Sequence, residues 1–324
     1  MNPLAVTDRR GFLAQLTLAG IGVAGASLSP AGRTAEAGVH AMKLCLAPGS
    51  IGVRANQTET IALAHRHGFT AVEPFPDFLA GLSSEQMTEL RAELEAKRLV
   101  WGAAGLPVEF RRDDGTFNEG LSRLPSLAAA LQRAGASRVG TWLSPGHGSL
   151  TYRQNFDQHA RRLREVSRVL ADHGLRLGLE YVGTFTSRAR QRFPFVHNLA
   201  ETRELIAAIG GENTGVVLDS WHWWQAGDTE VDLLALRPDD IVSVDLNDAP
   251  AGVAKDQQQD GKRELPAATG VIDVATFLRA LVRIGYAGPV RAEPFNQALN
   301  ALDNDPACAA TLAALRKAFS GVSP

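Results

Sequence analysis

Cysteine, histidine and aromatic residues are all scarce in this sequence. Its 324 residues include 2 cysteines and 8 histidines, and Phe, Trp and Tyr together make up 6%. Two cysteines exclude a disulfide framework, and neither Cys45 nor Cys308 has a Cys or His neighbour that suggests a zinc site. We expect each to be a small buried apolar residue. A formal net charge of -2 gives no electrostatic case for nucleic acid or an anionic membrane as partner.

Long apolar runs are also missing, apart from a Gly-broken stretch over residues 16–28. That stretch is shorter than the ~20 residues of a spanning helix, which disfavours a membrane anchor. Arg9 and Arg10 precede Phe12-Leu13 in a pattern that resembles a twin-arginine export signal. Ala35-Glu36-Ala37 matches the small-x-small pattern of a signal-peptidase site. We therefore predict a twin-arginine signal peptide over 1–37, cleaved after Ala37, with export to the periplasm or extracellular space. A disordered N-terminus is the alternative.

The rest of the chain, residues 38–324, has a length suited to one α/β barrel. Removing 37 of 324 residues leaves 287, and about 250 is typical of an eight-stranded barrel. Apolar runs alternate with segments of helical period, and no low-complexity linker divides them. The runs predict eight strands: Lys43–Ala47, Ala71–Pro74, Leu99–Ala103, Arg138–Trp142, Arg176–Tyr181, Gly215–Asp219, Ile241–Asp245 and Val290–Glu293.

This alternation predicts a single (β/α)8 TIM barrel, an α/β fold. Ser83-Ser84-Glu85-Gln86 is a capping-box pattern at a helix start. Gly68, Gly174 and Gly285 each end a helical segment just before a predicted strand. A doubly wound open sheet is the alternative, but no Gly-rich phosphate loop follows the first predicted strand.

Four acidic residues stand near the ends of apolar runs in the C-terminal half: Glu180, Asp219, Asp245 and Glu293. Packing does not explain a carboxylate in such a place. The carboxyl ends of parallel barrel strands converge on one mouth, where active sites of this fold lie. Four convergent carboxylates require a cation, so the pattern predicts a divalent-metal site. A solvated surface position explains any single glutamate equally well, but it does not explain four in register.

His222 follows Asp219 by three residues in Asp-Ser-Trp-His-Trp-Trp. We predict that it contacts substrate; a packed loop histidine is the alternative. Trp221, Trp223 and Trp224 offer apolar rings on which a sugar can stack and which can shield a metal from water.

Strand periodicity places Asp245 and Asn247 on one face and Asp248 on the other. Asp245 is therefore the predicted ligand, Asn247 is predicted to bind substrate, and Asp248 is expected to support the site or cap a turn. Arg263 precedes Pro266 at the end of a polar loop, and we predict that it reaches into the mouth. Lys255 and Lys262, in the same loop, are expected to be solvated.

Three further residues are predicted to line the pocket. Glu73 ends the second predicted strand, where it can hydrogen-bond a substrate hydroxyl or serve as a structural carboxylate. Trp142 and His147 follow the fourth predicted strand.

Taken together, these segments resemble the sugar isomerase/epimerase group of xylose-isomerase-like barrels. No single motif is decisive, but their order and spacing are specific, and the resemblance covers most of the chain after residue 37. The motifs are Gly-Phe-Thr-Ala-Val-Glu-Pro-Phe at 68–75, Leu-Gly-Leu-Glu at 177–180, Asp219-x-x-His222, Asn247-Asp248-Ala249-Pro250, Leu265-Pro266 before Gly270-Val271-Ile272-Asp273, and Gly285-Tyr286-x-Gly288-Pro289 leading to Glu293-Pro294-Phe295.

The resemblance implies a divalent metal held by residues matching Glu180, Asp219, Asp245 and Glu293. It implies that the two glutamates also transfer protons while an enediolate forms, and that His222 and Arg263 contact substrate oxygens.

Asp245 departs from the family pattern, which more often has His at this position. Four carboxylates leave a formal charge of -2 around a dication. Arg263, a protonated His222 or one protonated carboxylate would offset it; otherwise Asp245 is not a ligand, or the metal has been lost. An all-oxygen site favours Mn²⁺ or Mg²⁺ over Zn²⁺, with Mn²⁺ expected first.

The sequence thus predicts a metal-dependent isomerase or epimerase of an unphosphorylated keto-sugar or polyol-derived ketone. Export and the lack of an obvious basic cluster argue against a phosphorylated substrate. The alternative is a lyase or deglycosidase that expels the aglycone from a keto-glycoside with the same metal site. A metal-dependent endonuclease is disfavoured by the few histidines and the acidic charge, and a non-catalytic sugar-binding protein is the fourth interpretation. The predicted partner is a small sugar or polyol, and the oligomeric state stays open.

Overall fold

The computed structural model of this chain describes residues 41–322. The predicted signal peptide over 1–37 lies outside the described residues and stays a prediction. Within residues 41–322, no helix is long and apolar enough to cross a membrane.

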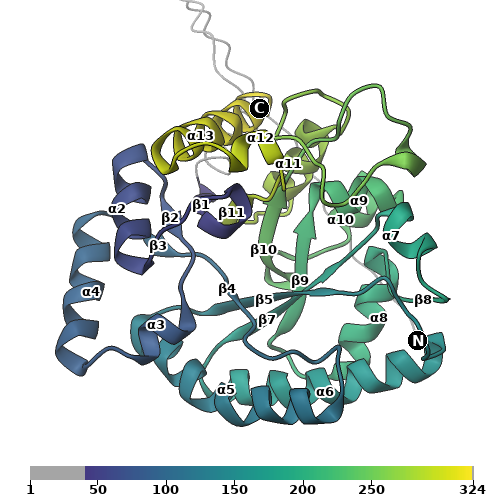
Figure 1. Cartoon of the computed structure of the whole chain (residues 1–324), viewed down its shortest axis with the longest axis horizontal. Helices are drawn as coiled ribbons and strands as arrows, with labels where there is room; N and C mark the ends of the chain where they lie inside the picture. Colours follow the sequence, from purple (N-terminus) through teal and green to yellow (C-terminus); the bar gives the residue numbers. More distant parts are fainter. Residues whose placement is uncertain (1–40, 323–324) are drawn as a thin grey trace, which may run out of the picture.

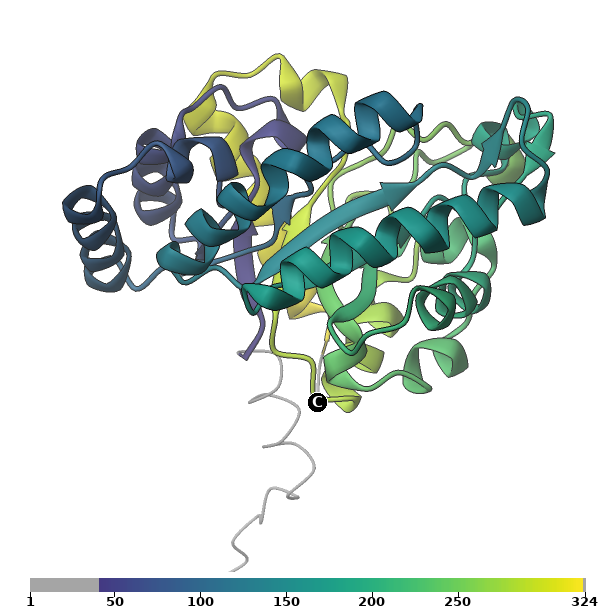
Figure 2. The same ribbon diagram turned by 90° about the horizontal axis from the view of Figure 1, so that it is seen from below.

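A curled sheet of parallel strands forms the centre of the molecule, and helices surround it (Figure 1). Figure 2, turned by 90°, shows helices on the outside of the strands in this view as well. The strands follow one another in the order β3-β2-β1-β11-β10-β9-β7-β5-β4. Their bounds are β1 Lys43–Leu46, β2 Ala71–Val72, β3 Val100–Trp101, β4 Ala104–Gly105, β5 Arg138–Leu143, β7 Arg176–Tyr181, β9 Thr214–Asp219, β10 Ile241–Leu246 and β11 Pro289–Ala292. A separate antiparallel pair joins β6 (Gly146–His147) to β8 (Phe193–Pro194).

The predicted (β/α)8 barrel is confirmed. The third predicted strand, Leu99–Ala103, contains β3, and β4 follows directly after it, so β3 and β4 together fill its place in the barrel. Strand β3 pairs with β2, and β4 pairs with β5. The chain over 100–105 therefore connects both edges of the sheet and closes the barrel. Gly102 lies at the break, where a Cβ would come within 2.5 Å of the Cys45 Sγ. The missing side chain allows β1 to approach this strand closely.

Helices connect successive strands. Their bounds are η1 Pro48–Ile51, α2 Gln57–His67, α3 Pro76–Ala80, α4 Ser84–Ala96, α5 Asp114–Ala134, α6 Tyr152–Asp172, α7 Phe185–Ala189, α8 Leu199–Ile209, α9 Ser220–Ala226, α10 Glu230–Leu234, η2 Pro238–Asp240, η3 Lys255–Gln257, α11 Val274–Arg283, α12 Gln297–Asn300 and α13 Asn304–Ser320.

The helix ends follow the sequence signals. The predicted capping box starts α4: the Gln86 amide donates to Ser83 Oγ, and the Ser83 amide donates to Gln86 Oε1. Gly68 ends α2 in the left-handed region at φ 86°, a conformation that favours glycine. Both cysteines are free and buried, as predicted.

Candidate active site

Four acidic side chains converge at the carboxyl ends of neighbouring strands. Glu180 lies in β7, Asp219 ends β9, Asp245 lies in β10, and Glu293 directly follows β11. Each offers one oxygen, and these oxygens all lie within 4.8 Å of one another. The apolar residues that precede them fill the barrel core, so the strands hold the carboxylates in place. The structure therefore brings the four predicted metal ligands together, and we call them the carboxylate cluster.

Strand register sets the order of the charges. Asp219 of β9 is the direct neighbour of Asp245 in β10, which is in turn the neighbour of Arg291 in β11. Paired residues of parallel strands face the same side of the sheet. Two carboxylates and a guanidinium therefore form a row across three strands.

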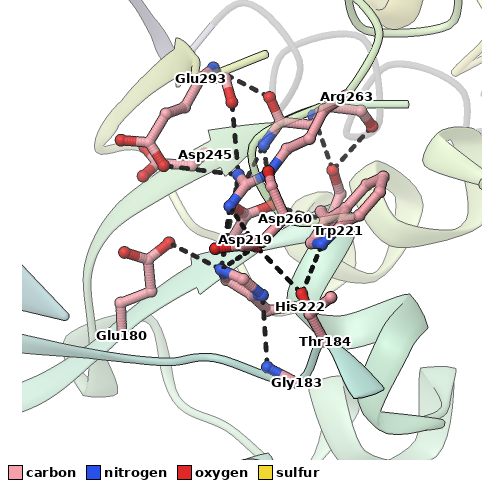
Figure 3. A network of polar contacts seen from close by, with 12 residues as sticks. Glu180, Gly183, Thr184, Asp219, Trp221, His222, Asp245, Asp260, Arg263 and Glu293 are labelled. Carbon is pink, nitrogen blue, oxygen red and sulfur yellow. Dashed lines mark hydrogen bonds and ion pairs between the residues drawn. The ribbon is translucent and has the colours of Figure 1, made fainter. Parts of the chain in front are cut away.

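Arg263 lies among these charges, between Asp219, Asp260 and Glu293 (Figure 3). Its Nη1 donates to Asp219 Oδ2 at 2.7 Å and lies 3.5 Å from Glu293 Oε2, while Nη2 donates to Asp260 Oδ1 at 2.9 Å. Burial acts against the charged guanidinium, but the surrounding carboxylates, Asp219 first, raise the pKa of Arg263 above its usual value. Arg263 is thus a charged group fixed inside the mouth.

Asp260 is a site residue that sequence reasoning missed. Thr184 Oγ1 donates to its Oδ1 at 3.0 Å, and Trp221 Nε1 donates to Thr184 Oγ1 at 2.8 Å. Burial raises the pKa of Asp260, but Arg263 and His222 outweigh it and leave that pKa below its usual value. Asp260 stands in a polar loop whose charges resemble solvated ones, so the sequence carried no signal for it.

His222 faces the carboxylate cluster as a neutral ring. Its Nε2 lies 3.9 Å from both Glu180 Oε1 and Asp219 Oδ2. Burial lowers the pKa of His222, and the nearby Arg263 adds to this effect, while Asp219 opposes it. Two donors, the Gly183 amide at Nδ1 and Arg263 Nη2 at Nε2, approach the ring at 3.3 Å and 3.2 Å. A neutral imidazole has one acceptor nitrogen and one N–H, so His222 accepts from only one of these two donors and adds no charge to the site.

Asn247 and Asp248 support the site. Asn247 Nδ2 donates to both oxygens of Asp219, at 3.0 Å and 3.1 Å, and its Oδ1 accepts the Glu293 amide at 3.0 Å. Asn247 was predicted to bind substrate, but its side chain holds two members of the cluster. Asp248 accepts the backbone amides of Thr269 and Gly270 through Oδ2, and those of Ala249 and Ile272 through Oδ1. It fixes the loop that follows Arg263.

Arg291 is a second residue that sequence reasoning missed. Its Nε donates to Asp245 Oδ1 at 2.6 Å, and its Nη2 donates to Asp245 Oδ2 at 2.9 Å and to Glu293 Oε1 at 3.0 Å. A signal existed, because Arg291 interrupts an apolar strand two residues before Glu293 and so shares its face.

The cluster disfavours its own ionisation. Burial, and then the charge of Glu293, raise the pKa of Glu180 well above its usual value. Burial is also the main cause that raises the pKa of Glu293 to about 7, although Arg291 opposes it. Ionised carboxylates in this cluster therefore lower the stability of the folded protein.

The donor set fits a divalent cation. Glu180 is 7% exposed, and its Oε1 is buried without a hydrogen-bond partner among the described residues. A buried carboxylate oxygen without a donor is the atom that a cation would satisfy. Oxygen ligands from Glu180, Asp219 and Glu293 suit Mn²⁺ or Mg²⁺, and the His222 ring nitrogen also suits Zn²⁺.

Two cavities meet at the glutamate pair. The smaller, of about 230 Å³, is lined by Arg111, Thr141, Ser243 and Arg291 among others. The larger, of about 310 Å³, is lined by His222, Asp260, Arg263 and Phe295 among others. Trp142, Glu180 and Glu293 line both. The glutamates thus stand where two parts of one ligand would join.

Exposed aromatic rings stand at the rim of these cavities. Trp142 is 47% exposed and Phe295 is 39% exposed. The predicted stacking role of the Asp219 segment is wrong for Trp221 and Trp223, which are buried in the core at 0% and 7% exposure. The rings available to a ligand come from other strand ends.

Two predicted pocket residues do not line these two cavities. The Glu73 carboxylate has no hydrogen-bond partner within residues 41–322, and neither cavity is lined by it. His147 Nδ1 accepts the Ser149 and Leu150 amides at 3.0 Å and 2.8 Å, so this ring stabilises its own turn.

This chain is similar to known proteins along most of its length. The model of the xylose isomerase-like TIM barrel family matches residues 61–318. Inosose isomerase from Bacillus velezensis is 24% identical over 263 residues, 78% of this chain and 89% of the relative. A xylose isomerase domain protein from Alicyclobacillus acidocaldarius is 32% identical with a TM-score of 0.76, over 87% of this chain and 100% of that one. The IolI protein, solved with a bound zinc atom, has a TM-score of 0.72 at 21% identity, over 86% of this chain and 98% of that one.

Proposed function

The chain belongs to the xylose isomerase-like TIM barrel family, and we propose that it is a metal-dependent sugar isomerase or epimerase. Its substrate is an unphosphorylated keto-sugar or polyol-derived ketone, which reacts through an enediolate. The observation that carries the proposal is the placement of Glu180 and Glu293 where the two cavities join. The inosose isomerase relatives indicate a sugar isomerase or epimerase enzyme.

Glu180 and Glu293 would move the proton between carbons. One glutamate, ionised, removes a proton from the carbon beside the carbonyl, and the other returns one from the opposite side. Burial raises the pKa of both, to about 7 for Glu293, which suits groups that give and take protons near neutral pH. Asn247 keeps Glu293 and Asp219 in position through its hydrogen bonds.

Glu180, Asp219 and Glu293 would hold the divalent metal, with His222 and Asp245 as further candidates from the same cluster. Bound there, the metal would supply positive charge that polarises the substrate carbonyl. We propose Mn²⁺ first, because carboxylate oxygens dominate the site.

The cavity charges support an unphosphorylated substrate. Three arginines line the two cavities, and each already binds a carboxylate: Arg111 binds Glu109, Arg263 binds Asp219 and Asp260, and Arg291 binds Asp245. None has the spare charge that a phosphate group requires.

Deuterium exchange tests this proposal directly. The protein with Mn²⁺ is incubated in D₂O with an inosose and a panel of unphosphorylated ketoses, and ¹H NMR follows the proton beside the carbonyl. We expect exchange and product formation, and a loss of about 10²–10⁴-fold in Glu180→Gln and Glu293→Gln. Glu89→Gln, at an exposed position in α4, is the matched control and should keep full activity. Exchange that survives both active-site variants would overturn the proposal.

A lyase or deglycosidase is the second candidate, favoured by the two cavities that meet at the glutamates and by the rim rings Trp142 and Phe295. A keto-glycoside could place its sugar in one cavity and its aglycone in the other. The same proton abstraction would then expel the aglycone. Released aglycone from keto-glycosides identifies the lyase, whereas an epimer or aldose–ketose pair identifies the isomerase.

We also propose export by the twin-arginine pathway with cleavage after Ala37. Strand β1 starts at Lys43, so the cleavage would remove no element of the barrel. The mass of the protein from the periplasm and the medium should correspond to residues 38–324, and Arg9→Lys/Arg10→Lys should abolish export. Full-length protein retained inside the cell would contradict this proposal.

A further inference from the structure

Arg291 places a positive charge inside the row of carboxylates. Its neighbours in β11, Val290 and Ala292, are buried and apolar. Strand register sets Arg291 directly beside Asp245, and Asp245 directly beside Asp219. The guanidinium is therefore held by the sheet itself rather than by a loop.

Asp245 is fully engaged by this guanidinium. Nε donates to Oδ1 at 2.6 Å and Nη2 donates to Oδ2 at 2.9 Å, so both oxygens accept from one planar fork. Two parallel charge-assisted bonds are the strongest geometry that such a pair adopts. Asp245 is 0% exposed, so its oxygens are shielded from solvent, while the Arg291 side chain is 25% exposed.

Glu180 shows the opposite condition in the same cluster. Its Oε1 is buried and has no hydrogen-bond partner among the described residues. Asp219 also contacts a guanidinium, but only its Oδ2 accepts from Arg263, which Asp260 and Glu293 share. Within the cluster, only Asp245 has both oxygens paired with one guanidinium fork.

We infer that Arg291 removes Asp245 from the metal-ligand set. The divalent ion would be held by Glu180, Asp219 and Glu293, with His222 as the neutral nitrogen near the first two. A dication bound by Asp245 would lie against the guanidinium that both of its oxygens hold. Displacing that guanidinium would leave it bonded only to Glu293. This inference deepens the proposed function, since it concerns the metal of the same site.

The inference also predicts the sign of the effect of Arg291 on metal affinity. Its Nη2 lies 3.0 Å from Glu293 Oε1, so its charge competes with a dication for that ligand. Removing the guanidinium should therefore strengthen metal binding, since it both frees Asp245 and takes away a positive charge.

Mn²⁺ titration of the full chain, with free ion measured by electron paramagnetic resonance at fixed pH, tests this inference without a substrate. Arg291→Met should bind Mn²⁺ at least about 10-fold more tightly than the wild type. Asp245→Asn/Arg291→Met removes both partners and leaves the net charge unchanged, so its Kd should stay within about 3-fold of the wild type. Asp219→Asn, which removes an assigned ligand, should weaken binding at least about 30-fold. Arg133→Met, at an exposed position in α5 outside the linings of both cavities, is the matched control and should leave Kd unchanged.

Each outcome of these titrations either supports or overturns the inference. A Kd that weakens about 30-fold in the double variant shows that Asp245 is a ligand and overturns the inference. Equal affinity in Arg291→Met and the wild type overturns it too, as does a lack of Mn²⁺ binding in both. Binding by Arg291→Met alone supports it. If Arg291→Met does not fold, the double variant is compared with Asp219→Asn instead. A Kd near that of the wild type in the double variant, with weakened binding in Asp219→Asn, then supports the inference. The expected titrations together with no proton exchange on any ketose would refute the proposed function and leave this inference standing.

Discussion

The two halves of the barrel differ in strand length and in charge. Strands β2, β3 and β4 have two residues each, whereas β5, β7, β9 and β10 have six each. All four members of the carboxylate cluster come from the second half, as do Arg263 and Arg291. The first half contributes Ala103 to Leu106 and Arg111, which form one wall of the smaller cavity.

This difference shows where a fold can hold buried charge. Carboxylates packed against one another require fixed counter-charges. The second half provides them, since β11 holds Arg291 and the loop after β10 holds Arg263. The short strands hold no such cluster, and their side of the barrel shapes the cavity instead. We therefore expect substitutions in the carboxylate cluster and its arginines to affect stability and chemistry, and those on the cavity walls and rim to affect mainly affinity.

The largest expected effect comes from removing Arg263. Arg263→Met leaves Asp219 buried without its 2.7 Å ion pair, at a cost of about 3–5 kcal/mol. We expect a melting temperature about 10 °C lower by calorimetry of metal-free protein, and recovery of most of it in Asp219→Asn/Arg263→Met. The counterpart on the cavity wall, Arg111→Met, breaks a partly exposed pair with Glu109 and should cost about 1 kcal/mol or less. Equal losses in both variants would erase the difference between the halves.

Glycine substitutions compare the rigidity of the two halves. A Cβ at Gly215, in β9, meets the Asp240 carbonyl oxygen at 2.4 Å, whereas a Cβ at Gly102, between β3 and β4, meets the Cys45 Sγ at 2.5 Å. The backbone of Asp240, at the end of η2 directly before β10, yields less than a side-chain sulfur. Urea unfolding should show Gly215→Ala losing about 3 kcal/mol and Gly102→Ala about 1 kcal/mol. Adding Cys45→Ala should restore part of the stability that Gly102→Ala loses. Equal losses in Gly102→Ala and Gly215→Ala would contradict the comparison.

The same difference explains how far the sequence alone could predict this structure. In the second half, apolar runs lead into carboxylates at or near their ends, so both the strands and Glu180, Asp219 and Glu293 could be placed from the pattern. In the first half, the break between β3 and β4 depends on the approach of Cys45 to Gly102, which no local pattern indicates.

Cross-strand contacts were equally hidden. The bonds of Arg291 to Asp245 depend on the register between β10 and β11, and those of Asp260 depend on the path of a loop. The stacking role predicted for Trp221 and Trp223 was wrong because a ring near a strand end can turn into the core as easily as toward the mouth. A single sequence gives periodicity along each strand but not pairing between strands.

Trp142 tests whether the cavity rim acts on affinity alone. It lines both cavities and stacks on the Arg111 guanidinium at 4.2 Å from the ring centroid. Trp142→Ala should raise KM about 10-fold through lost stacking while kcat changes less than about 3-fold. Phe185→Ala removes an equally exposed ring outside the linings of both cavities and should leave both constants unchanged. A fall in kcat at constant KM for Trp142→Ala would assign this ring to the chemistry instead.

The smallest effect should come from Glu73, the one strand-end carboxylate of the first half. Burial is the main cause that raises its pKa above the usual value, with Arg291 opposing. A raised folded-state pKa means that the folded protein binds more protons than the unfolded chain above pH about 4.5, so this group lowers stability as pH rises. Glu73→Gln should therefore stabilise the protein by about 1 kcal/mol at pH 7 and by nothing near pH 4. Denaturant unfolding at both pH values measures this difference. A destabilised Glu73→Gln at pH 7 would show that the ionised carboxylate has a partner, and the first half would then hold buried charge as the second half does.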